Sequence, residues 1–251
     1  DAAGTDRIDA NADDAQLLGE RPRKANQRVL GGAVGREHRR TLPAGDGGHR
    51  NNATPRAAQI GRDVLARGGN AIDAAVATGF AMAVTYPRAG NIGGGGFMMI
   101  HLANGEDIAI DYRESAPAAA TRAMFLGDDG KPDTKKSRDQ ALGIGVPGTV
   151  AGLVLALEKY GSGKFKLADI IAPAIPLARD GFVIVDDTAD TLPDWHRRLA
   201  KWPSSQKIFS RADGTSLQPG DRLVQSDLAI TLESIAANGV SGFYDGPIAD
   251  K

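Results

Sequence analysis

A short polar run, Asp111-Tyr112-Arg113-Glu114-Ser115, holds the residue types best suited to binding a small anion. It follows an alternating stretch that predicts a β-strand, and it precedes a loop that begins at Ala116. An arginine at a strand end can bind a carboxylate through two parallel hydrogen bonds. Arg113 is equally suited to a structural ion pair with Glu114 or Asp111. The residues alone leave these two interpretations evenly balanced.

The sequence contains no recognisable pair of a nucleophile and its base. It has no Ser-His-Asp arrangement and no G-x-S-x-G motif. It also has no cysteine, which excludes disulfides, thiolate nucleophiles and cysteine-based metal sites. The histidines show no i, i+4 pair and no carboxylate at ligand spacing; they are His38, His49, His101 and His196. We therefore expect no catalytic residue, no metal and no cofactor in this chain.

Two glycine motifs resemble phosphate-binding sequences, but their surroundings favour structural turns. The segment 143–148 matches G-x-G-x-x-G, yet the polar residues 135–140 precede it in place of a hydrophobic strand. The segment 161–164 lacks the first glycine of a phosphate loop and the Ser or Thr after its lysine. We interpret the first as a tight turn before a helix and the second as a loop that binds no phosphate.

The glycine cluster at residues 90–96 has two interpretations. Its backbone N–H groups could line a ligand site, or the cluster could mark a crossing where only glycine fits between packed sheets. Packing is the favoured interpretation.

Several elements must position this polar run, and together they predict an α/β chain. Strands are expected at 97–102 and 107–113 around the turn Asn104-Gly105, with Ile108 and Ile110 on one face and Arg113 on the other. Gly68 should end a first helix, and Asn70 should cap a buried second helix with Asp73 in its first turn. Further helices are expected at 149–160, at 167–178 with interruptions at Pro173 and Pro176, from Pro193, and at 227–238 with Ser226 as the N-cap.

Composition limits the possible partners and compartments. The chain has 251 residues and a net charge of −1, so no overall field directs it to nucleic acid. No apolar run approaches the roughly 20 residues that span a bilayer. The absence of cysteine fits an oxidising compartment. We expect a periplasmic or secreted bacterial protein whose signal peptide has been removed.

Five stretches resemble, in this order, the γ-glutamyltranspeptidase family; they are DVLARGGNAIDAAVA (63–77), GNIGGGGF (90–97), IDYRE (110–114), GVPGTVAG (145–152) and APA to LARDGF (172–182). The resemblance covers about residues 56–251. It implies the large subunit of an N-terminal-nucleophile hydrolase, a four-layer αββα sandwich that a small subunit from the same precursor completes. The nucleophile would be the N-terminal threonine of that small subunit. Arg113 matches the family arginine that binds the α-carboxylate of the γ-glutamyl substrate.

The sequence departs from the family pattern at both ends. Residues 1–55 form an atypical, poorly patterned segment, and residues 56–251 form a core that we expect to be incomplete at its C-terminal end. Residues 45–55 stand where the family has a Gly-Met-Val strand and a His-Pro-x-Ala segment. One hypothesis is a shifted reading frame in residues 30–55, which peptide mass spectrometry of this region would test.

Two other functions stay open. A glutaryl or cephalosporin acylase of the same fold would bind a glutaryl group, which is a glutamyl group without its α-amine. A non-catalytic binding protein is the alternative from another class.

Overall fold

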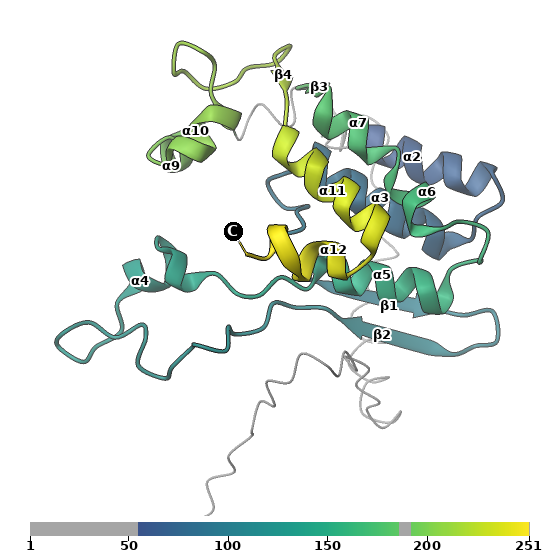
Figure 1. Cartoon of the computed structure of the whole chain (residues 1–251), viewed down its shortest axis with the longest axis horizontal. Coiled ribbons are helices and arrows are strands. Elements are labelled where there is room, and N and C mark those ends of the chain that lie inside the picture. Colours follow the sequence, from purple (N-terminus) through teal and green to yellow (C-terminus); the bar gives the residue numbers. More distant parts are fainter. Residues whose placement is uncertain (1–54, 186–191, 251) are drawn as a thin grey trace, which may run out of the picture.

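The computed structural model describes residues 55–185 and 192–250 (Figure 1). The predicted atypical segment, His38 and His49 therefore lie outside the described residues, apart from Pro55. The helices are α2 (Pro55–Ala66), α3 (Ala71–Thr85), α4 (Thr134–Arg138), α5 (Thr149–Tyr160), α6 (Leu167–Ile171), α7 (Ala174–Arg179), α9 (Leu192–Leu199), α10 (Pro203–Phe209), α11 (Ser226–Asn238) and α12 (Ser241–Tyr244). The strands are β1 (Phe97–His101), β2 (Asp107–Asp111), β3 (Phe182–Val183) and β4 (Arg222–Leu223).

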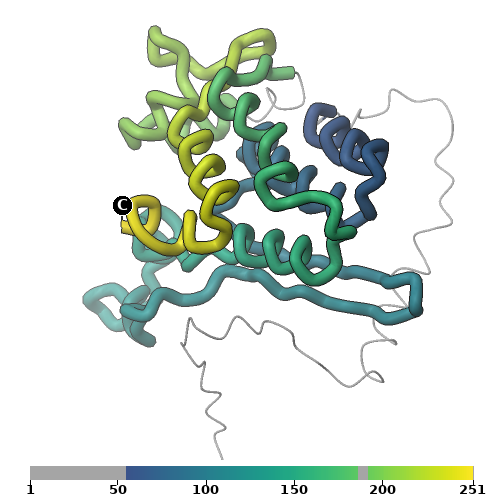
Figure 2. Tube along the Cα trace, turned by 45° about the vertical axis from the view of Figure 1, so that its right-hand side comes forward, coloured from purple at the N-terminus to yellow at the C-terminus, as the bar shows by residue number. Residues whose placement is uncertain are grey.

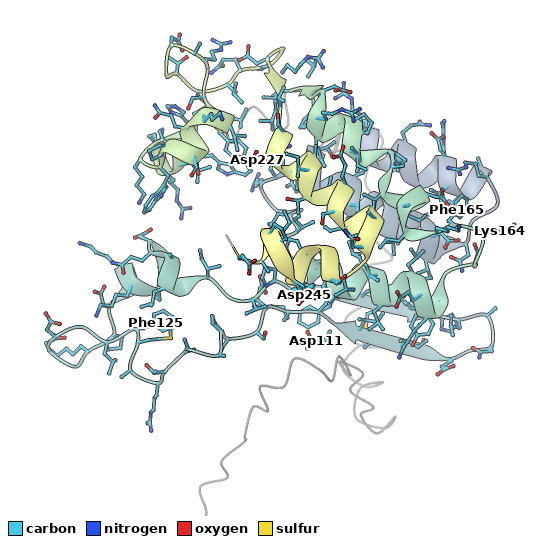
Figure 3. All side chains as sticks on the ribbon, viewed as in Figure 1. Asp111, Phe125, Lys164, Phe165, Asp227 and Asp245 are labelled. Carbon is cyan, nitrogen blue, oxygen red and sulfur yellow. The ribbon has the colours of Figure 1, made fainter. Side chains whose placement is uncertain are left out.

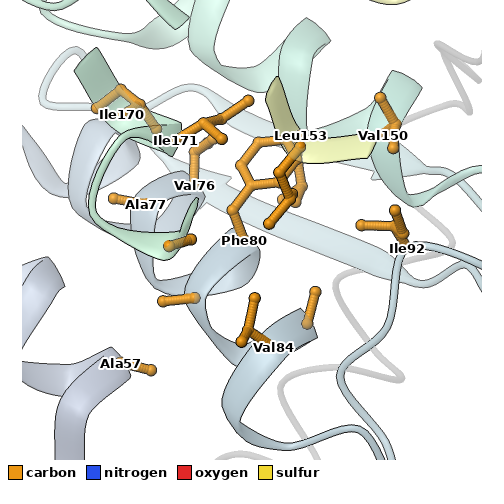
Figure 4. Close-up of a cluster of buried hydrophobic side chains, with 14 of the residues drawn as sticks. Ala57, Val76, Ala77, Phe80, Val84, Ile92, Val150, Leu153, Ile170 and Ile171 are labelled. Carbon is orange, nitrogen blue, oxygen red and sulfur yellow. The ribbon is translucent and has the colours of Figure 1, made fainter. Parts of the chain in front are cut away.

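Helix α3 lies at the centre of the helical layer. It is apolar on nearly all sides, as predicted, and it contacts α2, α5, α6 and α7. Val76, Phe80 and Val84 are fully buried, and Figure 4 shows Phe80 pointing from α3 toward Leu153 of α5. Burying an aromatic or branched side chain of this size contributes about 1.5–3 kcal/mol, so this contact fixes α5 against α3.

Strands β1 and β2 form an antiparallel hairpin along one side of these helices (Figures 1 and 2). Gly105 adopts a φ of 83° in the connecting loop, which confirms the predicted turn. Ile108 and Ile110 are buried, whereas Asp107 and Asp111 are exposed on the opposite face, as their alternation predicted. The hairpin thus presents its polar residues away from the helical layer.

The junction between α2 and α3 is a complete helix cap. Gly68 ends α2 with a φ of 86°. The Asn70 side chain accepts hydrogen bonds from the backbone N–H groups of Ile72 and Asp73, both at 2.9 Å. The Asp73 carboxylate is wholly buried and accepts in turn from the N–H of Asn70, at 2.8 Å, and of Ser162, at 3.1 Å. The N–H of Ser162, which a phosphate would need, is therefore used by Asp73.

Several element boundaries differ from those predicted. The polar stretch 126–140, expected as loop, contains α4. At 167–178 the expected interruption at Pro173 is confirmed, since Pro173 has no N–H to continue α6, whereas Pro176 lies inside α7 and does not interrupt it. Helix α9 begins at Leu192, one residue before the expected start. Ser226 is the first residue of α11 and not its N-cap; that position belongs to Gln225, whose side-chain amide donates to the carbonyl of Val84 at 2.9 Å.

No helix within residues 55–185 and 192–250 is long and apolar enough to cross a bilayer.

The cap before α3 gives a stability prediction. Asn70→Ala removes both side-chain acceptor bonds and the donor bond to the carbonyl of Tyr160, so the free energy of unfolding should fall by about 1–2 kcal/mol. Asn238→Ala is the control, because exposed Asn238 makes one bond to Ser234 and its loss should cost within about 0.5 kcal/mol. Urea unfolding of the purified protein measures both, and equal losses would contradict the capping role.

Candidate functional site

Arg113 lies just beyond the end of β2, on the edge of the hairpin. Tyr112 still pairs with Gly96 through N–H to O distances of 3.0 and 3.2 Å, and Arg113 follows directly. The backbone N–H of Arg113 donates to the Asp111 carboxylate at 3.0 Å. Figure 3 shows Asp111 at this end of β2. The Arg113 side chain is 63% exposed, so the strand end presents a cation to solvent.

The guanidinium of Arg113 is hydrogen-bonded through one of its three nitrogens within the described residues. Its Nε donates to the Glu114 carboxylate at 3.2 Å, and its central carbon lies 6.0 Å from the centre of the Phe97 ring. The two terminal nitrogens make no hydrogen bond to another residue in the described part of the chain. The structural ion pair considered from the sequence therefore exists with Glu114. Within the described residues this pair leaves both terminal nitrogens able to donate to a carboxylate.

Glu114 is stabilised in its charged form. Its own backbone N–H lowers the pKa of the carboxyl group most, the Arg113 guanidinium lowers it further, and partial burial opposes both. The N–H of Gly95 adds a smaller contribution in the same direction. A carboxyl group with a depressed pKa stabilises the fold above its unfolded pKa and loses that contribution as the pH falls through the folded value. Glu114 is thus ionised at neutral pH and keeps Arg113 oriented.

The glycine cluster at 90–96 packs closely against this polar run. A Cβ at Gly95 would lie 2.5 Å from the Tyr112 carbonyl oxygen and 2.8 Å from the Arg113 Cα. The carbonyl of Gly94 accepts from the N–H groups of Gly148 and Thr149 at 2.9 and 3.1 Å. Close packing is confirmed at Gly95, where a side chain would displace the backbone that carries Arg113, but the contact is with the end of β2 and not between two sheets.

The G-x-G-x-x-G segment contacts the same backbone from another direction. Ser115 and Val146 form an antiparallel bridge, with N–H to O distances of 3.1 and 2.8 Å. A Cβ at Gly148 would lie only 2.1 Å from the Tyr112 carbonyl oxygen. The segment ends at α5, so it is the tight turn before a helix that the sequence predicted. The glycines of this segment and of the cluster at 90–96 both allow close packing against the backbone around Arg113. The sequence motifs, taken separately, did not indicate that they pack against the same residues.

One histidine, His101, lies next to a carboxylate in the structure. His101 and Asp107 are six residues apart, but the hairpin register places them opposite each other, with 2.7 Å between Nδ1 and Oδ1. The spacing of the histidines along the sequence did not indicate this pair, because it depends on the hairpin register. Both side chains are more than two-thirds exposed. Residues 55–185 and 192–250 contain no group of three His, Asp or Glu side chains that could hold a metal ion.

An open cleft of about 760 Å³ lies elsewhere, beside α9 and α10. Its lining is basic and aromatic, and includes Arg88, Arg138, Arg197, Arg198, Lys201, Trp195, Trp202 and Phe209. Arg113 is not among its lining residues, so this cleft and the candidate site are separate.

The close approach at Gly95 can be tested against a neighbour in the same cluster. Gly95→Ala should lower the free energy of unfolding by about 1–3 kcal/mol, because the new methyl group meets backbone atoms that cannot move independently. Gly93→Ala should change it by less than about 0.5 kcal/mol, because its Cβ meets only the Asn91 side chain at 3.5 Å. Chemical unfolding of both variants checks this. A harmless Gly95→Ala would show that the backbone contact is not tight.

Comparisons with known proteins agree on one family. The model of the family described as "Gamma-glutamyltranspeptidase" matches residues 57–251. The chain is similar to the glutathione hydrolase proenzyme of Escherichia coli strain K12, with 52% identity over 195 residues that cover 78% of this chain and 33% of the relative. It is also similar to the acylase ACY 1 proenzyme of Pseudomonas sp. strain SE83, with 40% identity over 77% of this chain and 35% of the relative. The chain thus spans about a third of the length of these curated relatives.

A solved structure gives the same answer for the fold. The crystal structure of Helicobacter pylori gamma-glutamyltranspeptidase matches with a TM-score of 0.76 and 49% identity, covering 83% of this chain and 59% of that one. This likeness confirms the predicted fold class, the α/β sandwich of N-terminal-nucleophile hydrolases. The described residues supply helices on one face of the β1–β2 hairpin. The match over residues 57–251 and the 52% identity show that this chain belongs to the γ-glutamyltranspeptidase family.

Proposed function

We propose that this chain is the large-subunit part of a γ-glutamyltranspeptidase. The enzyme would cleave γ-glutamyl amides such as glutathione and transfer the glutamyl group to water, an amino acid or a peptide. Family membership and the glutathione hydrolase name of the 52% identical relative support this activity. The word proenzyme in that name supports a precursor that is processed into a large and a small subunit.

The observation that carries the proposal is the guanidinium of Arg113, which is hydrogen-bonded through Nε alone among the described residues. Its Nε is paired with Glu114, and its terminal nitrogens face no other described hydrogen-bond partner. In the proposed complex these nitrogens donate two parallel hydrogen bonds to the α-carboxylate of the γ-glutamyl group. Arg113 is a substrate-binding residue in this scheme, and no catalytic residue is proposed in this chain.

The chemistry itself would take place on the small subunit. The hydroxyl of its N-terminal threonine would attack the γ-amide carbon, with the free α-amine of the same residue accepting the proton. Backbone N–H groups would stabilise the oxyanion, and the leaving amine would depart protonated. The resulting γ-glutamyl ester would then be cleaved by water or by an acceptor amine. Arg113 contributes by holding the substrate at the far end, which orients the amide for attack.

A glutaryl or cephalosporin acylase is the second candidate. The 40% identity to the acylase ACY 1 proenzyme is the observation that favours it. Arg113 suits either substrate, because glutaryl and γ-glutamyl groups carry a carboxylate at the same end. The amine that distinguishes them would be recognised by the small subunit.

Location and partners follow from the same proposal. The partner would be the small subunit from the same precursor, and the compartment would be the periplasm or the exterior of a bacterium. A non-catalytic binding protein is the alternative of another class. N-terminal sequencing of a co-purifying chain decides between them, because a chain that begins with threonine supports the enzyme and its absence supports the binding protein.

Removing the guanidinium should weaken substrate binding. Arg113→Ala in the processed enzyme should raise KM for γ-glutamyl-p-nitroanilide by about 10- to 100-fold, since a hydrogen-bonded charge pair is worth about 1.5–3 kcal/mol. Arg113→Lys should recover only part of this loss, because lysine lacks the planar two-nitrogen fork. Steady-state kinetics measure both. Arg122→Ala is the control, because Arg122 is exposed and its side chain makes no hydrogen bond to another described residue. Unchanged kinetics in Arg113→Ala would refute the binding role of Arg113.

A direct substrate comparison separates the two enzymes. Rapid hydrolysis of γ-glutamyl-p-nitroanilide with little activity on glutaryl-7-aminocephalosporanic acid supports the transpeptidase. The reverse preference supports the acylase.

A further inference from the structure

Helix α5 begins without a capping side chain, although a cap would be expected at its position. The first N–H groups of a helix have no intrahelical partner, and Ser, Thr, Asp or Asn at the N-cap normally satisfies one of them. In α5 the N-cap is Gly148, which makes no side-chain bond. Any Cβ there would lie 2.1 Å from the Tyr112 carbonyl oxygen and 3.0 Å from that of Arg113. The close approach of Arg113's backbone therefore excludes the usual caps.

Tyr244 of α12 supplies the missing cap from a distant part of the chain. Its hydroxyl donates to the carbonyl of Pro147 at 2.7 Å and accepts from the N–H of Ala151 at 3.3 Å. Burial raises the pKa of Tyr244, so its hydroxyl keeps the proton it donates at neutral pH. One phenol oxygen thus joins the two ends of the turn 147–151, and Figure 1 shows α12 lying beside the start of α5.

The turn 147–151 also positions Tyr112 and Arg113, because it packs against both. Gly148 contacts the carbonyl of Tyr112, and a Cβ at Gly152 would lie 2.3 Å from Cγ of the Tyr112 ring. The ring therefore packs directly against the first turn of α5. Gly96 contacts its other atoms, where a Cβ would lie 3.0 Å from Cε2. A shift of the 147–151 turn would move Tyr112, and Arg113 is the next residue.

We propose that Tyr244 is a positioning residue for Arg113, acting through the turn 147–151 and the ring of Tyr112. Its hydroxyl replaces the helix cap that Gly148 cannot provide, and it thereby fixes the distance between Arg113 and the reacting amide. The inference rests on the proposed function, in which Arg113 binds the substrate carboxylate.

Tyr244→Phe tests this in the processed enzyme, since it removes only the phenol oxygen. KM for γ-glutamyl-p-nitroanilide should rise by about three- to ten-fold, the effect of about one ordinary hydrogen bond, while kcat stays within about two-fold. Tyr160→Phe is the matched control, because Tyr160 lies at the other end of α5 and its hydroxyl makes no hydrogen bond to another described residue. It should leave KM unchanged.

A second substrate distinguishes positioning from a general loss of structure. 4-Aminobutyryl-p-nitroanilide lacks the α-carboxylate, so kcat/KM for its hydrolysis should be the same in the wild type and in Tyr244→Phe. Equal loss on both substrates, together with a lower Tm, would mean that Tyr244 only stabilises the fold and would overturn the inference. An unchanged KM for the γ-glutamyl substrate would overturn it as well.

The failure of this inference can be separated from the failure of the proposed function. If the wild-type enzyme does not hydrolyse γ-glutamyl-p-nitroanilide, the function itself is wrong. If Arg113→Ala raises KM and Tyr244→Phe does not, the function stands and only the role of Tyr244 is refuted.

Discussion

The candidate site depends on one steric constraint, the contact of glycine backbone with the backbone of Tyr112 and Arg113. Gly95 approaches it from the loop before β1, and Gly148 approaches it from the turn before α5. Neither position has room for a Cβ. A strand end would ordinarily be free to move, but here it is enclosed by two segments far apart in the sequence. This enclosure gives an exposed arginine a fixed backbone without burying its charge.

Much of the fold could be predicted because its signals are local. The alternation around Ile108 and Ile110, the Asn-Gly turn and the cap at Asn70 each occupy a few neighbouring residues, and all were confirmed. The missed features depend on contacts between distant segments. Gln225 and not Ser226 is the N-cap of α11, and its side chain bonds to the carbonyl of Val84, 141 residues earlier. No local pattern contains such a partner.

The site was predictable only in part for the same reason. Residue type and position identified Arg113 as a possible carboxylate-binding residue. They did not show whether Glu114 would use all the hydrogen-bond donors of its guanidinium. Among the described residues, Glu114 bonds to Nε and no other side chain or backbone group bonds to the two terminal nitrogens. The bonds from Tyr244 to Pro147 and Ala151 span 97 and 93 residues, so no local pattern indicates them. The substrate role of Arg113 stays a prediction, supported by family membership and by terminal nitrogens that have no hydrogen-bond partner among residues 55–185 and 192–250.

The pairing of Arg113 with Glu114 also affects how a ligand would reach the site. A guanidinium beside an ionised carboxylate is neutral as a pair, and the field of such a pair falls off faster with distance than that of a single charge. Electrostatic steering of an anion over one or two Debye lengths, roughly 8–16 Å at physiological ionic strength, is therefore weak. Attraction becomes strong only when the ligand is close enough to contact the terminal nitrogens. Association at this strand end would accordingly proceed at an ordinary diffusive rate and vary little with salt concentration.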